Sequence, residues 1–425
     1  MGVSMRIAVI GAGIVGITTA YELTLAGHQV TVFEQRGSVA AECSFANGGV
    51  LAGGDAAPWC AHGVPLRVLR QMFSGEATAR LGGLDALMHL PWLWRAWRAG
   101  RPRAYASQRH AMQRLALFSR LRQLELTRTL RLEFEHMPGY LVLLRGEAEF
   151  KRAQPGLALL REWGVKHEVA DPARCRTVEP GLNPTTPLHA GIYFAEDGAG
   201  NCRQFAQLLK AEAQRLGTLF RFDTAVQAIK PGAPAELEVV GPAASGCETF
   251  DAVVICAGAA AAPLLKRVGV KLPLLALHGY TVTAPLRHVD GLLTPGPHAA
   301  LTDFRHRIAI TRMGQRVRVS GIAEIGGDPE YLALGPLRLL HRVLNDWFPG
   351  ATLTQNAQHW KGARPALPDG PPVLGASGAQ GVWLNLGHGN HGWTLACGSA
   401  RVLAETISGR DAGIDPTGLT IDRLR

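Results

Sequence analysis

Two spacings of hydrophobic residues alternate along this chain, and they predict where strands and helices lie. Apolar runs at 7–10 and 30–33 are typical of buried parallel strands. A glycine-rich turn follows the first run, and a helical pattern leads from that turn to the second run. The first 34 residues are therefore predicted to form a strand, a turn, a helix and a second strand.

Farther along the chain, helical spacing predicts helices over much of 66–135, over 204–216 and over 334–347. The apolar run at 251–259 predicts a buried parallel strand that returns to the first sheet. Shorter alternating runs predict further strands at 140–144, 225–229, 237–240, 277–283, 307–312 and 316–321. The last three are joined by short turns, which predicts an antiparallel sheet.

The first turn carries the glycine spacing of dinucleotide-binding proteins. Gly11 is expected to make the tight turn, Gly13 to let the backbone approach a pyrophosphate, and Gly16 to let the helix pack on the strand. The start of the helix would present its free N–H groups to the phosphates. Glu34 lies 18 residues after Gly16, near the distance expected of an acid that binds ribose hydroxyls. The alternative is a glycine-rich turn without function.

A second glycine-rich segment, 385–398, runs into a helical pattern at 399–407. It is a second candidate for an anion-binding helix N-terminus, far from the first in sequence. A nicotinamide dinucleotide needs only one such site, whereas FAD is longer and its ring end commonly meets a second helix N-terminus. The segment therefore predicts FAD, and the alternative is a surface loop before a docking helix.

These elements predict an α/β fold in which a Rossmann-like, FAD-binding domain is interleaved with an antiparallel-sheet substrate domain that carries added helices. A chain of 425 residues exceeds the size of a single hydrophobic core, which also favours two domains. The predicted FAD-binding domain is discontinuous and comprises 1–58, 198–270 and 355–425. The predicted substrate domain comprises 59–197 and 271–354.

Composition describes a well-packed globular chain, with 47% hydrophobic and 18% charged residues. The seven cysteines are scattered without a C-x-x-C pair, which argues against a disulfide framework or a zinc site and for a reducing compartment. No metal is expected. No signal peptide precedes the first strand, and the longest apolar stretch, 252–265, is too short to span a bilayer. A cytoplasmic protein is expected.

Much of the net charge of +10 comes from 67–131, which holds thirteen arginines, no lysine and three acidic residues. Within it, 90–98 interleaves tryptophan and arginine on a helical pattern. This combination suits an anionic membrane, contacted peripherally on the inner face of the plasma membrane. It also suits a solvated helix whose long side chains cover apolar surface. Nucleic acid is disfavoured because no reading motif accompanies the charge.

The chain resembles the flavin-dependent D-amino acid dehydrogenases, within the wider superfamily of D-amino acid oxidase and glycine oxidase. The resemblance runs along nearly the whole chain and departs at Asn390, His391 and His62. It rests on the fingerprint at 11–34 and on the blocks 44–49, 56–59, 200–205, 309–314, 318–324, 364–370, 387–389 and 392–394.

The resemblance implies FAD, bound non-covalently, and an amino acid whose Cα–H leaves as a hydride to flavin N5. FAD carries that chemistry, and the protein orients the substrate. The expected contacts to FAD come from both glycine turns, the loop after the second strand and two strand ends. They are Gly11, Gly13, Ile14, Val15, Gly16, Glu34, Gln35, Ser44, Asn47, Gly48, Gly49, Val50, Val226, Ala257, Gly258, Arg364, Gly387, His388, Gly389, Asn390, His391, Gly392, Trp393 and Thr394.

A substrate carboxylate calls for an arginine that faces the ring, because a guanidinium pairs with it bidentately. The resemblance implies that Arg312 holds this role, with a surface salt bridge as the alternative. Arg364 could bind substrate or support the flavin. Tyr280 could offer a site hydroxyl or belong to the core, and His391 could place a charge near the flavin or the substrate amine. His62 could lie at the substrate gate or on the surface.

Three functions are open at this point. The first is oxidation of D-amino acids to 2-oxo acids and ammonia through an imino acid, with electrons passed to a quinone or another carrier. The second is oxidation of a cyclic or secondary amino acid such as D-proline, hydroxy-D-proline, glycine or sarcosine. The third is a flavin-binding subunit of a larger redox complex.

Overall fold

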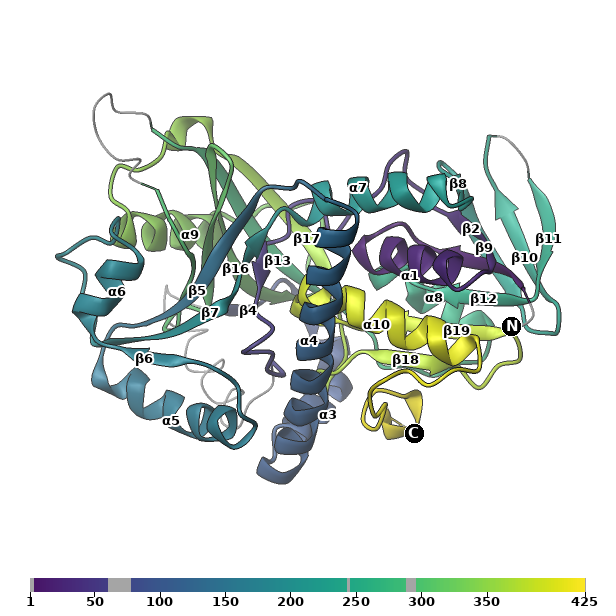
Figure 1. Ribbon diagram of the computed structural model, residues 1–425, viewed down its shortest axis with the longest axis horizontal. Helices are drawn as coiled ribbons and strands as arrows, with labels where there is room; N and C mark the ends of the chain where they lie inside the picture. Colours follow the sequence, from purple (N-terminus) through teal and green to yellow (C-terminus); the bar gives the residue numbers. More distant parts are fainter. Residues whose placement is uncertain (1–3, 60–77, 243–244, 288–295, 425) are drawn as a thin grey trace.

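The computed structural model describes residues 4–59, 78–242, 245–287 and 296–424. It contains a six-stranded, a ten-stranded and a three-stranded sheet, with long helices between and around them (Figure 1). The six-stranded sheet and its helices form one end of the molecule, and most of the ten-stranded sheet forms the other. Within the described residues, no helix combines the length and the apolar character that crossing a bilayer requires.

The six-stranded sheet is parallel except for its edge strand β18, which is antiparallel to β19. Its central strands are apolar on both faces because helices or another sheet cover both. In spatial order its strands are β18 (Val373–Ala376), β19 (Val382–Leu386), β12 (Ala252–Ile255), β1 (Arg6–Ile10), β2 (Gln29–Phe33) and β8 (Leu219–Arg221).

Three helices cover one face of this sheet and share its core, namely α1 (Ile14–Leu25), α7 (Cys202–Arg215) and α10 (Gly392–Ile407). The other face packs against the short helix α8 (Ala261–Arg267) and the three-stranded sheet. The strands of that small sheet are β9 (Ala225–Lys230), β10 (Ala235–Val240) and β11 (Gly246–Phe250).

The ten-stranded sheet is mainly antiparallel. The helix α9 (Leu334–Trp347) packs its apolar side on one face of this sheet, where both contribute fully buried residues. In spatial order the strands are β17 (Gln358–Ala366), β13 (Leu275–Pro285), β16 (Arg316–Ile325), β15 (Ile308–Met313), β14 (Ala300–Asp303), β5 (His136–Leu144), β7 (Ala190–Gly200) and β3 (Val50–Leu51), with β4 (Ala79–Leu81) beside β16 and β6 (Glu168–Ala170) beside β7.

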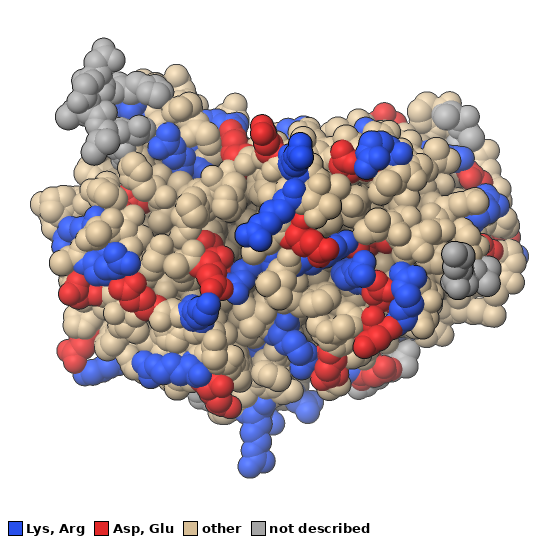
Figure 2. Space-filling view, viewed as in Figure 1, with Lys and Arg blue, Asp and Glu red and all other residues tan. Residues whose placement is uncertain are grey.

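The 28-residue helix α4 (Pro102–Thr129) crosses the middle of the molecule and packs against α10 (Figure 1). Its Arg122 pairs at 2.7 Å with the buried carboxylate of Glu22 in α1, which also lies 3.4 Å from Arg401 of α10. One buried acid thus joins three helices. Acidic and basic side chains are interspersed over much of the face seen in Figure 2, and basic side chains project beyond the body at the end where α4 begins.

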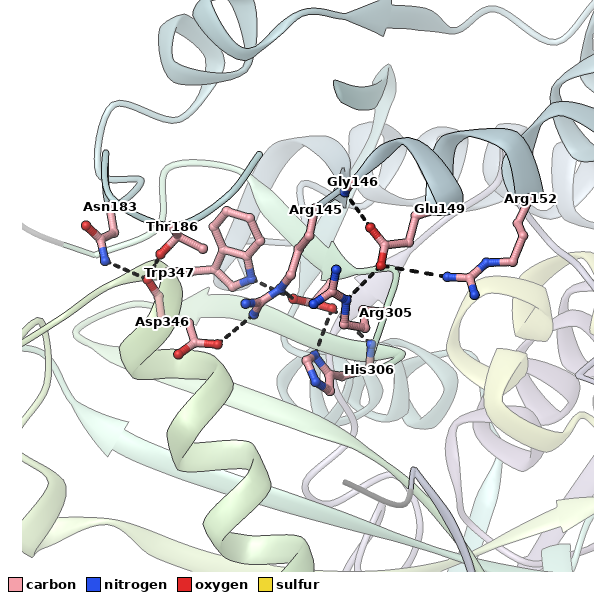
Figure 3. Close-up of polar contacts among 11 residues, drawn as sticks. Arg145, Gly146, Glu149, Arg152, Asn183, Thr186, Arg305, His306, Asp346 and Trp347 are labelled. Atoms are coloured by element: carbon pink, nitrogen blue, oxygen red, sulfur yellow. Dashed lines mark hydrogen bonds and ion pairs between the residues drawn. The ribbon is translucent and has the colours of Figure 1, made fainter. Parts of the chain in front are cut away.

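A buried polar network fastens α5 (Glu147–Glu162) and α9 to the ten-stranded sheet. Arg145, His306 and Trp347 converge on the carboxylate of Asp303 (Figure 3), with Arg145 Nε at 2.7 Å and Trp347 Nε1 at 2.8 Å. Burial opposes ionisation of this carboxyl, but His306 and Arg145 outweigh it and hold the pKa of Asp303 well below its usual range. Glu149 at the start of α5 bonds Arg305 in the same region.

Most predicted elements lie where the hydrophobic pattern placed them, with two corrections. The described part of 66–135 includes the short strand β4 and a 3-10 helix, η1 (Leu84–His89), before α3 (Leu90–Ala99) and α4. β4 forms because it pairs with β16, a contact that periodicity does not reveal. The last helix begins at Gly392 and not near 399, because packing of α10 against α1 overrides the loop signal of the glycines.

The domain boundaries stay a prediction. The strands β3 and β17 fall within the ranges expected to bind FAD, yet both pair in the ten-stranded sheet. Segments assigned to the FAD-binding domain therefore contribute strands to the sheet of the other domain, and the chain also passes between the two domains several times.

Candidate cofactor and substrate site

Two glycine turns lie at the same edge of the six-stranded sheet. The parallel strands β1 and β19 each run through such a turn into a helix, α1 and α10 respectively. The carboxyl ends of parallel strands meet at one edge, so both helices begin there, and they pack against each other (Figure 1). This edge presents two helix N-termini to a single elongated anion.

The first turn is too tight for any side chain at two of its positions. Gly11 has a φ of +101°, and an added Cβ there would lie 2.8 Å from the carbonyl oxygen of Cys256. A Cβ at Gly16 would lie 1.9 Å from the carbonyl oxygen of Gly11. At Gly13 an added Cβ meets only an ordinary 3.5 Å contact, to Ser44. The turn is therefore closed toward the sheet and more open at its middle glycine.

Glu34 stands at the end of β2, beside this turn. Its Oε2 accepts a hydrogen bond from the Ala12 N–H at 2.7 Å, and its Oε1 accepts one from the Arg36 N–H at 2.9 Å. Burial raises the pKa of Glu34, and the two amide donors oppose that rise. The carboxylate is thus held by backbone next to the phosphate-binding turn, while the neighbouring Gln35 is exposed.

Two further predicted contacts border the same edge. Ala257 follows β12, and its Cα lies 3.0 Å from where a Cβ on Gly11 would be. Gly258, next along the chain, has a φ of +56°. Val226 is half-buried in β9, which begins where the Thr224 N–H donates to the carbonyl oxygen of Glu34.

In the second turn, His388 is a buried structural residue. Its Nε2 lies 2.9 Å from Ser399 Oγ, whose hydroxyl donates in turn to the carbonyl oxygen of Leu395. Burial lowers the pKa of His388 to about 3, so the ring is neutral at physiological pH. Gly387 before it has a φ of +84°, and an added Cβ there would lie 2.4 Å from the side chain of Leu367.

The remaining residues of the second turn divide between surface and core. Asn390 is exposed, whereas Trp393 is buried in the core of the six-stranded sheet and donates to the Gly200 carbonyl oxygen at 3.2 Å. Thr394 contacts the Val50 carbonyl oxygen at 3.4 Å, which ties the start of α10 to β3.

The loop 44–50 is held against the ten-stranded sheet by its carbonyl groups. Gly48 and Gly49 approach the sheet so closely that an added Cβ would lie 2.1 Å from Ser320 Oγ or 2.0 Å from Met313 Cε. Gly49 also has a φ of +82°, a backbone conformation that favours glycine. Three sheet side chains donate to consecutive carbonyls: Thr281 to Ala46 at 3.0 Å, Arg318 to Asn47 at 2.9 Å and Thr311 to Gly48 at 2.9 Å.

Arg364 of β17 is placed deep in the protein with an uncompensated charge. Its two terminal nitrogens donate to the carbonyl oxygens of Ile322 at 2.8 Å and Gly321 at 3.2 Å. Within the described ranges, no carboxylate pairs with it, and burial lowers its pKa. The guanidinium lies over Gly279, where an added Cβ would be 2.2 Å from Nη2. The residue as a whole is half-buried.

A bulge in β16 aims these carbonyls at Arg364. The pairing of β13 with β16 shifts by one residue between His278 and Tyr280, and Ile322 has a φ of +63°. A bulge re-aims the groups beside it, and here it turns two successive carbonyls toward one guanidinium.

His391 lies near Arg364 at the start of α10. Its Nε2 is 3.0 Å from the carbonyl oxygen of Ala57, which makes Nε2 the protonated nitrogen and leaves Nδ1 as an acceptor. Burial and the positive charge of Arg364 lower the pKa of His391. The hydrogen bond to Ala57 and the negative charge of Asp55 oppose this decrease. The imidazole is therefore neutral at physiological pH.

Strand pairing places Tyr280 on the other face of the sheet, in the core, which is one of the two places expected for it. Side chains alternate between faces, and Gly279 and Thr281 face Arg364 and the loop. Tyr280 is fully buried toward α9, and its hydroxyl donates to Glu324 Oε2 at 2.8 Å. Burial and Glu324 raise its pKa to about 12. Tyr280 is a core residue.

The same alternation turns Arg312 away from the loop 44–50. Thr311 faces the loop, so Arg312 faces away from it, at the end of β15. Its Nε donates to the carbonyl oxygen of Gly314 at 2.8 Å in the adjoining turn. The structure thus brings Arg364, and not Arg312, to the loop and the second glycine turn. The other catalytic candidate, His62, lies outside the described residues.

Sequence reasoning missed the aromatic wall beside Arg364. The rings of Phe45 and Trp360 lie 6.4 Å apart, and a Cβ on Gly362 would be 1.7 Å from the Trp360 ring. Gly279 and Gly362 pair with each other across β13 and β17. A glycine inside a strand signals close approach of another group, so these two residues were the available signal.

Two helix N-termini at one sheet edge and a buried cation beside them define a dinucleotide-binding protein with an anion site at one end. The sequence profile of the family DAO, described as FAD dependent oxidoreductase, matches residues 6–406. The chain belongs to this family and is an FAD-dependent oxidoreductase.

Named relatives agree with this membership. The chain is 38% identical to a D-amino acid dehydrogenase of Cereibacter sphaeroides, with 99% of this chain and 95% of the relative covered. It is 36% identical to one of Sinorhizobium medicae, with 99% and 100% covered. Its fold is similar to that of glycine oxidase from Geobacillus kaustophilus, with a TM-score of 0.75 and 21% identity over 99% of each chain.

The residues present fit FAD. The turn that contains Gly11 and Gly16 has no side chains at these positions, which suits a pyrophosphate. The carboxylate of Glu34 beside it suits a ribose. The second turn and the uncompensated Arg364 lie at the same sheet edge, where a longer cofactor with a ring end extends. We assign the ADP half to 11–16, Glu34 and Val226, and the ring end to 387–394.

Proposed function

We propose that this protein oxidises D-amino acids to 2-oxo acids and ammonia, and that Arg364 binds the substrate carboxylate. The observation that carries the proposal is a buried guanidinium that bonds two carbonyl oxygens and no acid among the described residues. The relatives named D-amino acid dehydrogenase support this class of substrate.

An amino acid carries a carboxylate and an amine on one carbon, so a fixed carboxylate positions the Cα–H. The planar guanidinium of Arg364 suits a carboxylate because two parallel N–H groups match its two oxygens. The absence of a side chain at Gly279 leaves room for the guanidinium itself, which lies directly over this residue. Burial strengthens this charge-assisted pair because fewer water molecules compete for it.

The oxidation removes the Cα hydrogen with its electron pair and one proton from nitrogen, which leaves a C=N bond. Water then hydrolyses this imine to the 2-oxo acid and ammonia. When bound, FAD supplies the acceptor of the hydride. Arg364 orients the carbon, and the rings of Phe45 and Trp360 restrict water on that side.

The substrate nitrogen has to be neutral before the hydride leaves, because its lone pair forms the new double bond. His391 is neutral and keeps Nδ1 as an acceptor, with Arg364 nearby. We therefore assign to His391 the acceptance of a hydrogen bond from the substrate nitrogen. We assign the electrons to a quinone or another carrier, in keeping with relatives named as dehydrogenases.

The deciding experiment is anaerobic reduction of the bound flavin by a panel of amino acids. The reduction is measured as the loss of the visible absorbance of the flavin. D-Amino acids are expected to bleach the flavin and L-amino acids are not. Bleaching only by D-proline, hydroxy-D-proline, glycine or sarcosine would overturn the substrate class. No bleaching by any member would favour a flavin-binding subunit. Reoxidation by air faster than by a soluble quinone would overturn the assigned acceptor.

A further inference from the structure

Large apolar side chains are exposed together on one short part of the surface. We call the exposed residues of η1 and α3 the apolar patch: Leu87, Met88, Leu90, Trp94 and Trp97, with exposed fractions of 55, 76, 56, 57 and 44%. A surface helix ordinarily turns polar side chains outward. An apolar surface of this kind marks a site of interaction.

The helix α3 is apolar on two sides. Trp92, Ala96 and Ala99 are buried against the protein at helical spacing. Trp94 and Trp97 lie on the outer side, with their rings stacked at 4.8 Å. The buried residues explain why α3 is fixed to the protein. They do not explain why Trp94 and Trp97 are apolar on the exposed side.

Arginines surround the apolar patch without acidic partners. Arg95, Arg98, Arg101 and Arg103 are exposed, and none of them forms an ion pair with another described residue. The guanidinium of Arg101 lies 5.2 Å from the ring centre of Trp97. These residues lie toward the end of the molecule where α4 begins and where basic side chains project (Figures 1 and 2).

Acidic charge is nearly absent from the same segment. Asp85 is the one acid between 78 and 105, and both its carboxylate oxygens accept the N–H of Gly327, at 3.0 and 2.9 Å. The segment therefore combines apolar area with mainly positive charge, and further exposed acids, Asp328 and Glu330, lie on the neighbouring loop that begins at Gly327.

We propose that η1, α3 and the first turn of α4 dock on an anionic lipid bilayer. The apolar patch enters the boundary between headgroups and acyl chains, and the arginines lie against lipid phosphates. Helices that bind membrane surfaces combine an apolar side with basic residues and aromatic rings in this way. Four exposed arginines without an acidic partner among the described residues favour a surface of many anions over a single protein partner or a second copy of the chain.

The docking surface is joined to the ring end of the cofactor site. Trp92, on the inner side of α3, stacks on Trp59 with ring centres 5.0 Å apart. Trp59 Nε1 donates to the Leu367 carbonyl oxygen at 3.2 Å, and the Leu367 side chain lies against Gly387. A bilayer held by α3 would therefore lie on the side of the protein that supports the second glycine turn.

The test is sedimentation of the FAD-loaded protein with vesicles of phosphatidylglycerol and phosphatidylcholine, compared with phosphatidylcholine alone. Binding is expected only to the anionic vesicles, at low salt, with release near ~1 M salt, where the screening length falls to about 3 Å. Brominated phosphatidylglycerol is expected to quench tryptophan fluorescence. The measurement needs no substrate, so its result is independent of the proposed reaction.

Two double variants and a matched control locate the surface. Trp94→Ala with Trp97→Ala should abolish the quenching by brominated lipid. Arg95→Gln with Arg98→Gln should weaken binding roughly fivefold per arginine and about 30-fold together. Leu216→Ala with Leu219→Ala removes other exposed apolar side chains, 38 and 62% exposed, and should bind as wild type.

Retained flavin absorbance and an unchanged thermal midpoint will show that each variant is folded. The proposal is overturned if the wild type does not sediment with anionic vesicles at low salt, or if both patch variants bind like the control. Conversion of a dimer to a monomer by the tryptophan variant, without any loss of vesicle binding, would assign the patch to a second copy.

Discussion

The two faces of the ten-stranded sheet differ in chemistry although they are built from the same strands. Toward the loop 44–50, the strands present hydroxyls and guanidinium groups, including Thr281, Arg318 and Arg364. Toward α9, they present Val282, Ile310 and similar residues, packed into a buried core. Alternation along each strand thus separates the part of the sheet that meets ligands from the part that provides stability.

Because of this separation, two residues that are neighbours in a strand can have different roles. Thr281 and Tyr280 are neighbours, yet one holds the loop and the other lies against α9. Variants on one face should therefore change the chemistry, and variants on the other should change the free energy of unfolding.

The largest effect is expected on the loop face. Arg364→Ala should lower kcat/KM roughly 30-fold or more, because the substrate carboxylate loses a buried partner. This corresponds to a loss of about 2–5 kcal/mol in transition-state stabilisation. Arg364→Lys should also impair turnover, since it keeps the charge and loses the fork. Steady-state kinetics with a D-amino acid and measurement of FAD content check this.

Arg312→Ala is the matched control, because it removes an arginine from the same sheet on the other face. It should keep near wild-type kcat/KM. A severe loss in Arg312→Ala, with Arg364→Ala unaffected, would reverse the assignment of the two arginines.

On the α9 face, Leu340→Ala should lower the free energy of unfolding by about 2–5 kcal/mol, because it leaves a cavity in a closed core. Its kcat/KM per bound flavin should not change. Leu334→Ala, at a position 62% exposed on the same helix, is the control and should leave stability nearly unchanged. Denaturant unfolding measures both, and equal losses would contradict the packing described for α9.

The pH dependence of stability distinguishes the regions further. The pKa of His388 falls from about 6.5 in an unfolded chain to about 3 in the native state, so the unfolded state binds more protons between these values. Stability should therefore fall as the pH falls below about 6.5, by on the order of 2 kcal/mol between pH 7 and pH 5. His388→Gln should remove that part of the slope in unfolding experiments.

Asp303 provides the contrast on the side of α9. Its native pKa is lowered, so its contribution is present above its unfolded pKa of about 3.9 and is lost only below it. Asp303→Asn should lower stability at every pH from 5 to 7 without changing the slope. A slope that follows Asp303 and not His388 would show that the protonation states are assigned incorrectly.

The smallest effect is expected for Tyr280→Phe. Glu324 loses one hydrogen bond but keeps Arg80 at 3.2 Å and Lys361 at 2.6 Å. Stability should fall by about 1–2 kcal/mol, and kcat/KM should stay unchanged. Kinetics that worsen tenfold at unchanged stability would place this hydroxyl in the site after all.

The geometry of the first glycine turn, and with it the use of FAD, could be predicted because the determinants are local. A strand, two obligatory glycines and an acid at a set distance form one continuous unit, and the family membership agrees with it. The two glycine turns also share one sheet edge for a local reason, since each follows a parallel strand directly.

The substrate half could not be predicted in the same way, because the face of a strand residue depends on pairing between distant segments. Arg364 meets Gly279 only through the pairing of β17 with β13. Arg312 and Tyr280 are plausible from residue type alone, and alternation turns both away from the loop 44–50. The start of α10 at Gly392 likewise depends on packing against α1.

The extra residue in β16 has a consequence for how this chain tolerates insertions and deletions. Deletion of one residue near Ile322 would put a single residue opposite Gly279, so Glu324 would still pair with His278 and keep its bond to Tyr280. Deletion would instead straighten the strand and turn the two carbonyls away from Arg364, which would leave the guanidinium without its backbone acceptors. We therefore expect a one-residue deletion here to act on the loop face of the sheet and to leave the register of the α9 face unchanged.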